Sequence, residues 1–68
     1  MKLETFNFFQ KSNREGTLFS REVTLEEAQR IVTEMANETQ RTCIANNFRT
    51  SISVEPESFT EFRNSINN

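Results

Sequence analysis

Residues 24–40 read TLEEAQRIVTEMANETQ, and this stretch decides the fold. Its apolar side chains recur at a spacing of three or four positions, which is the repeat of an α-helix with one buried side. The stripe consists of Leu25, Ala28, Ile31, Val32 and Met35. We therefore predict an amphipathic helix over 24–40 whose apolar stripe packs on the core of the protein.

The residues at 23–27 predict where this helix starts. Thr24 is a favourable N-cap residue, and Glu27 follows three positions later, which is the spacing of a capping box. Glu26 and Glu27 lie in the first turn, where the helix dipole favours negative charge. Val23 precedes the cap and can pack against Ala28 as a hydrophobic staple.

The segment before the helix has the pattern of a β-hairpin. Residues 3–9 are short and aromatic, which is typical of a strand, and 17–23 form a second apolar-containing run. The polar residues 11–16 between them end in the single glycine, Gly16. We expect a hairpin loop there in which Gly16 takes a positive φ.

The segment after the helix predicts further strand structure. Residues 41–45 are a third strand, and 48–54 alternate cleanly between apolar and polar positions. The residues expected on the inner side are Phe48, Thr50, Ile52 and Val54. The pair at 46–47 suits a tight turn because Asn tolerates left-handed backbone. The pattern leaves open whether 41–54 is a hairpin or one long strand.

A terminal helix is predicted after the only proline. Pro56 suits the first position of a helix, and apolar residues follow it at helical spacing. They are Phe59, Phe62 and Ile66. The resulting order is ββαββ with this short C-terminal helix, so we expect an α+β fold: an antiparallel sheet of three to five strands with one main helix on one face.

The chain length limits the size of the core. With 68 residues, the sequence predicts a single domain over 1–68. Seven phenylalanines suit a two-layer core with one or two aromatic side chains left over. Phe9 has the opposite strand parity to Phe6 and Phe8, so we expect at least one of the three to point away from the helix.

The composition excludes several kinds of chemistry. The chain has no His and a single Cys, so a disulfide framework, a Cys/His zinc site and a cysteine–histidine nucleophile are all ruled out. We predict that Cys43 is a buried structural thiol. No catalytic motif is present, and we expect no enzyme activity, no metal site and no cofactor. Without an apolar run of about 20 residues or a signal-peptide pattern, we expect a cytoplasmic protein with no membrane segment.

What remains is a binding role. The net charge of −2 does not favour a general nucleic-acid binder. Six arginines against two lysines, together with surplus aromatic side chains, favour contacts with another protein. Two alternatives stay open: a small nucleic-acid-binding regulator that uses the sheet phenylalanines, and a homodimeric assembly factor.

Residues 14–17, Arg-Glu-Gly-Thr, and residues 24–31, Thr-Leu-Glu-Glu-Ala-Gln-Arg-Ile, resemble a turn and a helix start in a small type I-F anti-CRISPR family of phages and mobile elements. The resemblance covers residues 13–32. It implies a protein that inhibits or modulates a host protein complex by covering its surface in the host cytoplasm. A CRISPR surveillance complex would be the partner, with nucleic acid involved only indirectly.

In that family basic helix residues contact the partner, and Arg30 occupies such a position in this chain. Gln29 stands where the family is basic, and the later part of the helix is acidic, which is a departure from the pattern. We predict a partner-binding surface built from the main helix and the hairpin loop. Its residues are Arg14, Gln29, Arg30, Thr33 and Asn37.

Overall fold

The structure is a computed structural model, and it describes residues 2–13 and 16–67. The elements are β1 (Glu4–Gln10), a 3₁₀ turn (Lys11–Asn13), β2 (Phe19–Val23), α1 (Leu25–Thr39), β3 (Cys43–Asn46), β4 (Ser51–Val54) and α2 (Glu57–Asn67). The predicted α+β class and the ββαββ order with a terminal helix are confirmed.

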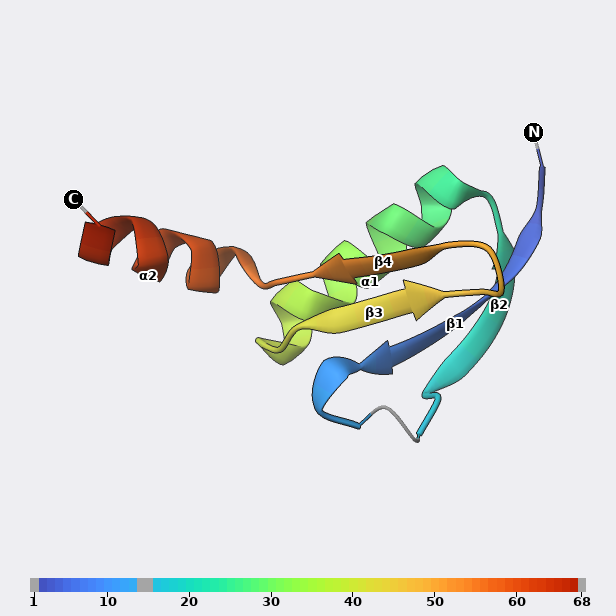
Figure 1. Ribbon diagram of the computed structural model, residues 1–68, viewed down its shortest axis with the longest axis horizontal. Coiled ribbons are helices and arrows are strands. Elements are labelled where there is room, and N and C mark those ends of the chain that lie inside the picture. The colour runs from blue at the N-terminus through green and yellow to red at the C-terminus, as the bar shows by residue number, and fades with distance from the viewer. Residues whose placement is uncertain (1, 14–15, 68) are drawn as a thin grey trace.

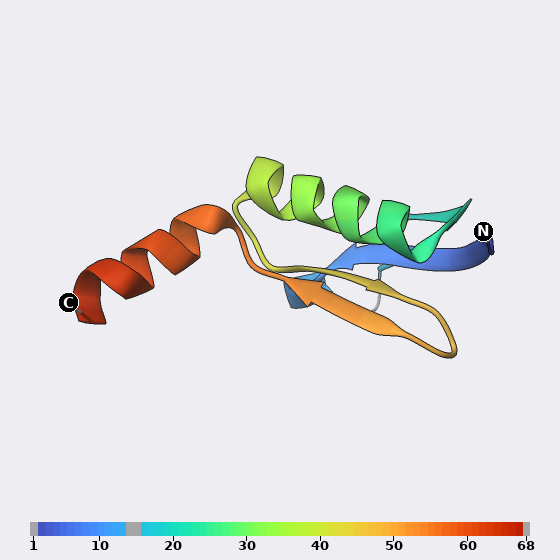
Figure 2. The ribbon, with the colours of Figure 1, turned by 90° about the horizontal axis from the view of Figure 1, so that it is seen from above.

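The four strands form one antiparallel sheet in the order β2-β1-β3-β4. Helix α1 covers one face and packs against β1, β3 and β4 (Figures 1 and 2). Strand β1 lies in the centre because it pairs with β2 on one side and with β3 on the other. Strands β2 and β4 are therefore the two edges of the sheet.

Helix α1 begins as its sequence predicts. Thr24 has extended backbone, and its hydroxyl accepts a hydrogen bond of 3.2 Å from the amide of Glu27. The helix ends at Gln40, which takes the left-handed conformation with φ 56° and donates its amide to the carbonyl of Ala36. A left-handed residue after the last turn is a common helix stop, although Gly or Asn fills it more often.

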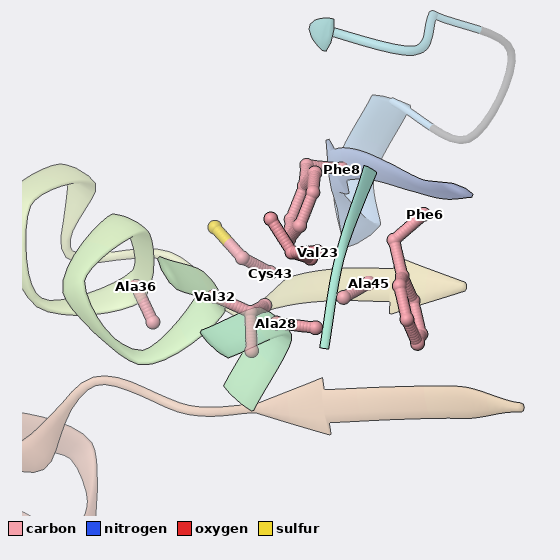
Figure 3. Packing of buried hydrophobic residues seen from close by; sticks show 8 residues of the cluster. All are labelled: Phe6, Phe8, Val23, Ala28, Val32, Ala36, Cys43 and Ala45. Atoms are coloured by element: carbon pink, nitrogen blue, oxygen red, sulfur yellow. The ribbon is translucent and has the colours of Figure 1, made fainter. Parts of the chain in front are cut away.

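The core lies between α1 and the sheet, and Figure 3 shows its buried cluster. The cluster contains Phe6, Phe8, Val23, Ala28, Val32, Ala36, Cys43 and Ala45. The predicted burial of Cys43 is confirmed. The expected stripe on α1 is partly wrong: Leu25 is exposed, while Ala36, which the stripe left out, is buried. Ile31 and Met35 are half-buried at the edge of the cluster.

The three aromatic side chains of β1 differ in their contact with the core. Phe6 and Phe8 belong to the buried cluster, whereas Phe9, which follows Phe8 on the opposite parity, is 8% exposed and is not part of the cluster. That a side chain of the three points away from the helix stays a prediction. Three of the seven phenylalanines are thus buried, and four are exposed. This is more than the one or two surplus aromatics that the sequence suggested.

The segment 41–54 is a hairpin rather than one long strand. Asn46 belongs to β3, and the turn spans 47–50, so the expected turn at 46–47 is displaced. The side-chain carbonyl of Asn47 accepts the amides of Arg49 (2.8 Å) and Thr50 (2.7 Å). Phe48 lies in this turn and is 95% exposed, so its expected inward position in a strand is wrong.

The first hairpin is longer in its loop than expected. Strand β2 begins at Phe19 instead of residue 17, and the amide of Leu18 reaches the carbonyl of Phe8 at 2.9 Å. The expected positive φ of Gly16 depends on the peptide that joins it to Glu15, which lies outside the described residues. Beyond the other end of the sheet, α2 extends away from the body (Figures 1 and 2).

Candidate functional site

The outer side of α1 carries four of the five predicted binding residues. Gln29, Arg30 and Thr33 are exposed, and Asn37 is half-buried. The Thr33 hydroxyl donates to the carbonyl of Gln29 at 2.7 Å, so it is already engaged within its own helix. The structure thus brings the four residues onto one helix surface. The fifth, Arg14, lies outside the described residues.

Arg30 is the basic residue of α1, and it is exposed. Among the described residues the ion pairs join Glu4 with Arg49 at 4.0 Å and Glu55 with Arg63 at 2.8 Å. Within that part of the chain, no carboxylate lies within 4 Å of the Arg30 guanidinium. An exposed guanidinium with no internal partner can form a bidentate contact with a carboxylate on another protein.

Asn37 has a structural contact that the sequence could not show. Its side-chain carbonyl accepts the backbone amide of Glu57 at 2.8 Å, so α1 caps the first turn of α2. Ser58 donates its hydroxyl to the side-chain carbonyl of Gln40 in the same region. Asn37 is therefore occupied where α1 meets α2, and its predicted role in partner binding stays a prediction.

Helix α2 carries an apolar side that the body of the protein covers only in part. Phe59 is 43% exposed and Phe62 is 68% exposed, although they share a helix side at i, i+3 spacing. Pro56, just before the helix, is fully buried and fixes its base to the body. The rest of α2 projects beyond the sheet, as Figure 2 shows. We call Phe59 and Phe62 the α2 aromatic pair.

Several further apolar side chains are exposed at the opposite end of the molecule. Phe48 at the tip of the β3–β4 turn and Leu3 before β1 border a cavity of about 330 Å³. Its lining residues are Lys2, Leu3, Glu4, Thr5, Asn47, Phe48 and Arg49. The α2 aromatic pair and Phe48 therefore mark two separate apolar surfaces, since β3 and β4 run between them (Figure 1).

The amino-acid pattern predicts α2 only in part. The spacing of Phe59 and Phe62 predicted the helix correctly, but the same spacing is typical of a helix that packs on a core. Whether the apolar side of α2 is covered or exposed depends on the direction in which the chain leaves β4. The exposure of the pair was therefore missed, and no residue in the segment marks it.

The described residues hold no candidate metal site and no membrane-spanning helix. In 2–13 and 16–67 there is no group of three or more His, Cys, Asp or Glu placed to hold a metal ion. None of the helices described is long and apolar enough to cross a membrane. The features that the described residues do offer are exposed aromatic side chains and guanidinium groups outside the two ion pairs, that of Arg30 among them.

Comparison with known proteins yields no relative. No family model matches the chain, and no match was found among curated proteins or among solved structures.

Proposed function

We propose that this chain is a binding protein that inhibits or modulates a protein complex by covering part of its surface. The observation that carries the proposal is the α2 aromatic pair, held on a projecting helix whose base is fixed to the body. Monomeric proteins bury such aromatic stripes, and exposed ones mark protein contacts. The mode that fits is the insertion of an amphipathic helix into an apolar groove of the partner.

The outer surface of α1 supports the same role. Asn37 and Gln40 of α1 contact the first turn of α2, so the two helices are held in a fixed relation at this junction. A partner that accepts the α2 aromatic pair can place a carboxylate near Arg30. The α2 aromatic pair would then supply apolar contact, and the contact at Arg30 would fix the orientation of the bound partner, because charge pairs across an interface select the docking register.

The class of partner follows from the resemblance within residues 13–32. It suggests a host complex attacked by phages and mobile elements, with a CRISPR surveillance complex as the first to test, and action in the host cytoplasm. The chain would act on the protein surface of that complex and affect nucleic acid only indirectly. The net charge of −2 agrees with binding to a protein surface rather than directly to nucleic acid.

The test is affinity capture with three baits: the wild-type chain, Phe62→Ser and Phe48→Ser. The baits are incubated with bacterial lysate and, separately, with purified type I-F surveillance complex. We expect the wild-type chain and Phe48→Ser to retain a stoichiometric protein partner and Phe62→Ser to lose it. Phe48 is a matched control because it is an even more exposed phenylalanine on the other apolar surface.

Two results of the capture experiment would contradict the proposal. If no bait retains a stoichiometric protein, the chain is not an inhibitor of this kind. If Phe48→Ser loses the partner while Phe62→Ser keeps it, the binding surface lies at the β3–β4 turn, and α2 is not the docking helix.

A further inference from the structure

We infer that two copies of this chain pair through their β2 edges in antiparallel register, with Ser20 at the two-fold axis. Strand β2 is an edge of the sheet, and α1 packs on the other three strands. Four of its five residues, Phe19 to Glu22, are exposed. An uncovered edge strand offers free backbone N–H and C=O groups to a further strand. This dimer is independent of the partner proposed for α2.

The apolar layer of the core continues to this edge. The ring of Phe19 stacks on the buried ring of Phe8, with centroids 4.8 Å apart and planes inclined by 20°. The Arg21 guanidinium lies 5.5 Å from the Phe19 centroid. Phe19 nevertheless stays 36% exposed, and Leu18 beside it is 53% exposed. Exposed aromatic and aliphatic side chains on an edge strand favour association. Strand β2 also carries the charged residues Arg21 and Glu22, so it can pair only in a register that opposes no like charges.

Symmetry limits the ways in which two β2 strands can pair. Side-by-side antiparallel pairing in one sheet needs a two-fold axis perpendicular to the sheet, so one residue faces itself and its neighbours pair at equal offsets. Centring the axis on Arg21 would place two guanidinium groups opposite each other, and centring it on Glu22 would oppose two carboxylates. Like charges directly opposite are unfavourable in a sheet. Both registers are therefore excluded.

The remaining registers are centred on Phe19, Ser20 or Val23, and an axis at Val23 is excluded because it would set the strand opposite the start of α1 at Leu25. With the axis at Ser20, residues 17–23 of one copy lie opposite residues 17–23 of the other, running in the reverse direction. With the axis at Phe19, only residues 17–21 of the two copies pair, and the end of the strand after Arg21 stays unpaired. With Ser20 at the centre, Arg21 of each copy lies opposite Phe19 of the other. The cation–π contact seen within one chain can then form twice across the interface. This register uses the whole strand and opposes no like charges.

The other edge is less suited to the same role. Strand β4 presents Ser51 and Ser53 as its exposed residues, while Ile52 and Val54 pack toward the core cluster. It therefore shows no exposed aromatic or aliphatic side chain comparable to Leu18 and Phe19. This difference makes β4 the matched control for β2, because both edges carry an exposed serine at a central position.

The first experiment places a cysteine at each edge. Residues directly opposite in an antiparallel pair have Cα atoms about 4.5–5.5 Å apart, which is within the range for a disulfide. We expect Ser20→Cys to form a covalent dimer under mild oxidation, and Ser53→Cys to remain uncrosslinked. The native Cys43 is fully buried and should not react in either variant. Crosslinking of Ser53→Cys without Ser20→Cys would overturn the inference.

The second experiment measures association without a covalent bond. Sedimentation equilibrium of the wild-type chain should show a monomer–dimer equilibrium, with a Kd in the micromolar range that is usual for small interfaces. Ser20→Lys places two like charges at the axis and should raise this Kd by about fivefold or more. Ser53→Lys should leave it unchanged, and so should Phe62→Ser.

Two controls keep the result decisive. Ser20 donates to the side-chain carbonyl of Asn7 at 2.7 Å, so circular dichroism must confirm that its variants are folded. If Ser20→Lys does not fold, the cysteine variant decides, because cysteine is close to serine in size. A wild-type chain that stays monomeric up to about 100 µM would overturn the proposed dimer.

Discussion

The two helices of this protein have the same kind of amphipathic sequence, but they differ in how far the fold covers their apolar sides. Both carry apolar residues at helical spacing, and both follow a cap or a proline that starts a helix. On α1 the apolar side is covered by three strands, and Val32 is fully buried. On α2 the aromatic pair stays exposed. Amphipathic spacing thus predicts that a helix forms, but the surface that covers it depends on the path of the chain.

Capping separates the two helices as well. The first turn of α1 is capped by Thr24, its own neighbour in sequence. The first turn of α2 is capped by Asn37, which is 20 positions away on α1. The start of α1 is therefore determined locally, and the start of α2 depends on the fold already being in place. We therefore expect that removing each cap changes the stability of the protein to a different extent.

The largest expected effect comes from placing a charge on the apolar side of each helix. Val32→Asp would bury a carboxylate in the cluster under α1, at a cost of several kcal/mol. A domain of this size has only about 3–5 kcal/mol of stability, so we expect this variant to be unfolded. Phe62→Asp on α2 should change the free energy of unfolding by less than about 0.5 kcal/mol. Urea titration followed by circular dichroism compares the two.

The outcome of this pair bears directly on the proposed function. If Phe62→Asp also unfolds the chain, α2 contributes to the core, and its aromatic pair is structural. If both variants remain folded, the cluster under α1 does not hold the molecule together.

A smaller effect is expected from the local cap. Thr24→Ala removes the side-chain acceptor of the Glu27 amide, which should lower the free energy of unfolding by about 1 kcal/mol. Thr33→Ala is a suitable control because Thr33 lies on the exposed side of the same helix and its hydroxyl bonds only to the carbonyl of Gln29. Equal losses in the two variants would mean that the cap is not the source of the effect.

The fold could be predicted from the sequence where local chemistry decides it. The helix start at Thr24, the opposite parity of Phe6 and Phe9, and the burial of Cys43 all depend on spacing within a few residues. The position of Phe48 could not be predicted in this way. Its alternation with Ile52 and Val54 matched a strand, but Asn47 binds two backbone amides and turns the chain before the strand begins.

The candidate site was harder to predict for the same physical reason. Exposed residues on α1 follow from its periodicity, so the positions of Gln29, Arg30 and Thr33 on one surface could be predicted. The contact of Asn37 with α2 and the exposure of Phe62 depend on where α2 leaves the sheet. Such long-range placement is set by the assembled tertiary structure, which no single segment encodes.

The distant cap of α2 should produce a local effect. Asn37→Ala removes the acceptor of the Glu57 amide, so the first turn of α2 should open more often. Global stability should fall by less than about 0.5 kcal/mol, since no residue of α2 belongs to the cluster. Hydrogen exchange should quicken at the amides of residues 57–59 and stay unchanged at 28–36. Faster exchange in α1 as well would show that the two helices open as one unit.

The smallest effect on stability is expected at Arg30. Arg30→Gln removes an exposed charge with no carboxylate within 4 Å in the described part of the chain, so the free energy of unfolding should change by less than about 0.3 kcal/mol. If the outer side of α1 assists α2 in binding, capture of the protein partner should nevertheless weaken, because a charge-assisted contact is lost. Arg63→Gln is the control, since Arg63 already pairs with Glu55 at 2.8 Å. Partner capture that is unaffected by Arg30→Gln but abolished by Phe62→Ser would confine the binding surface to α2 and leave α1 with a purely structural role.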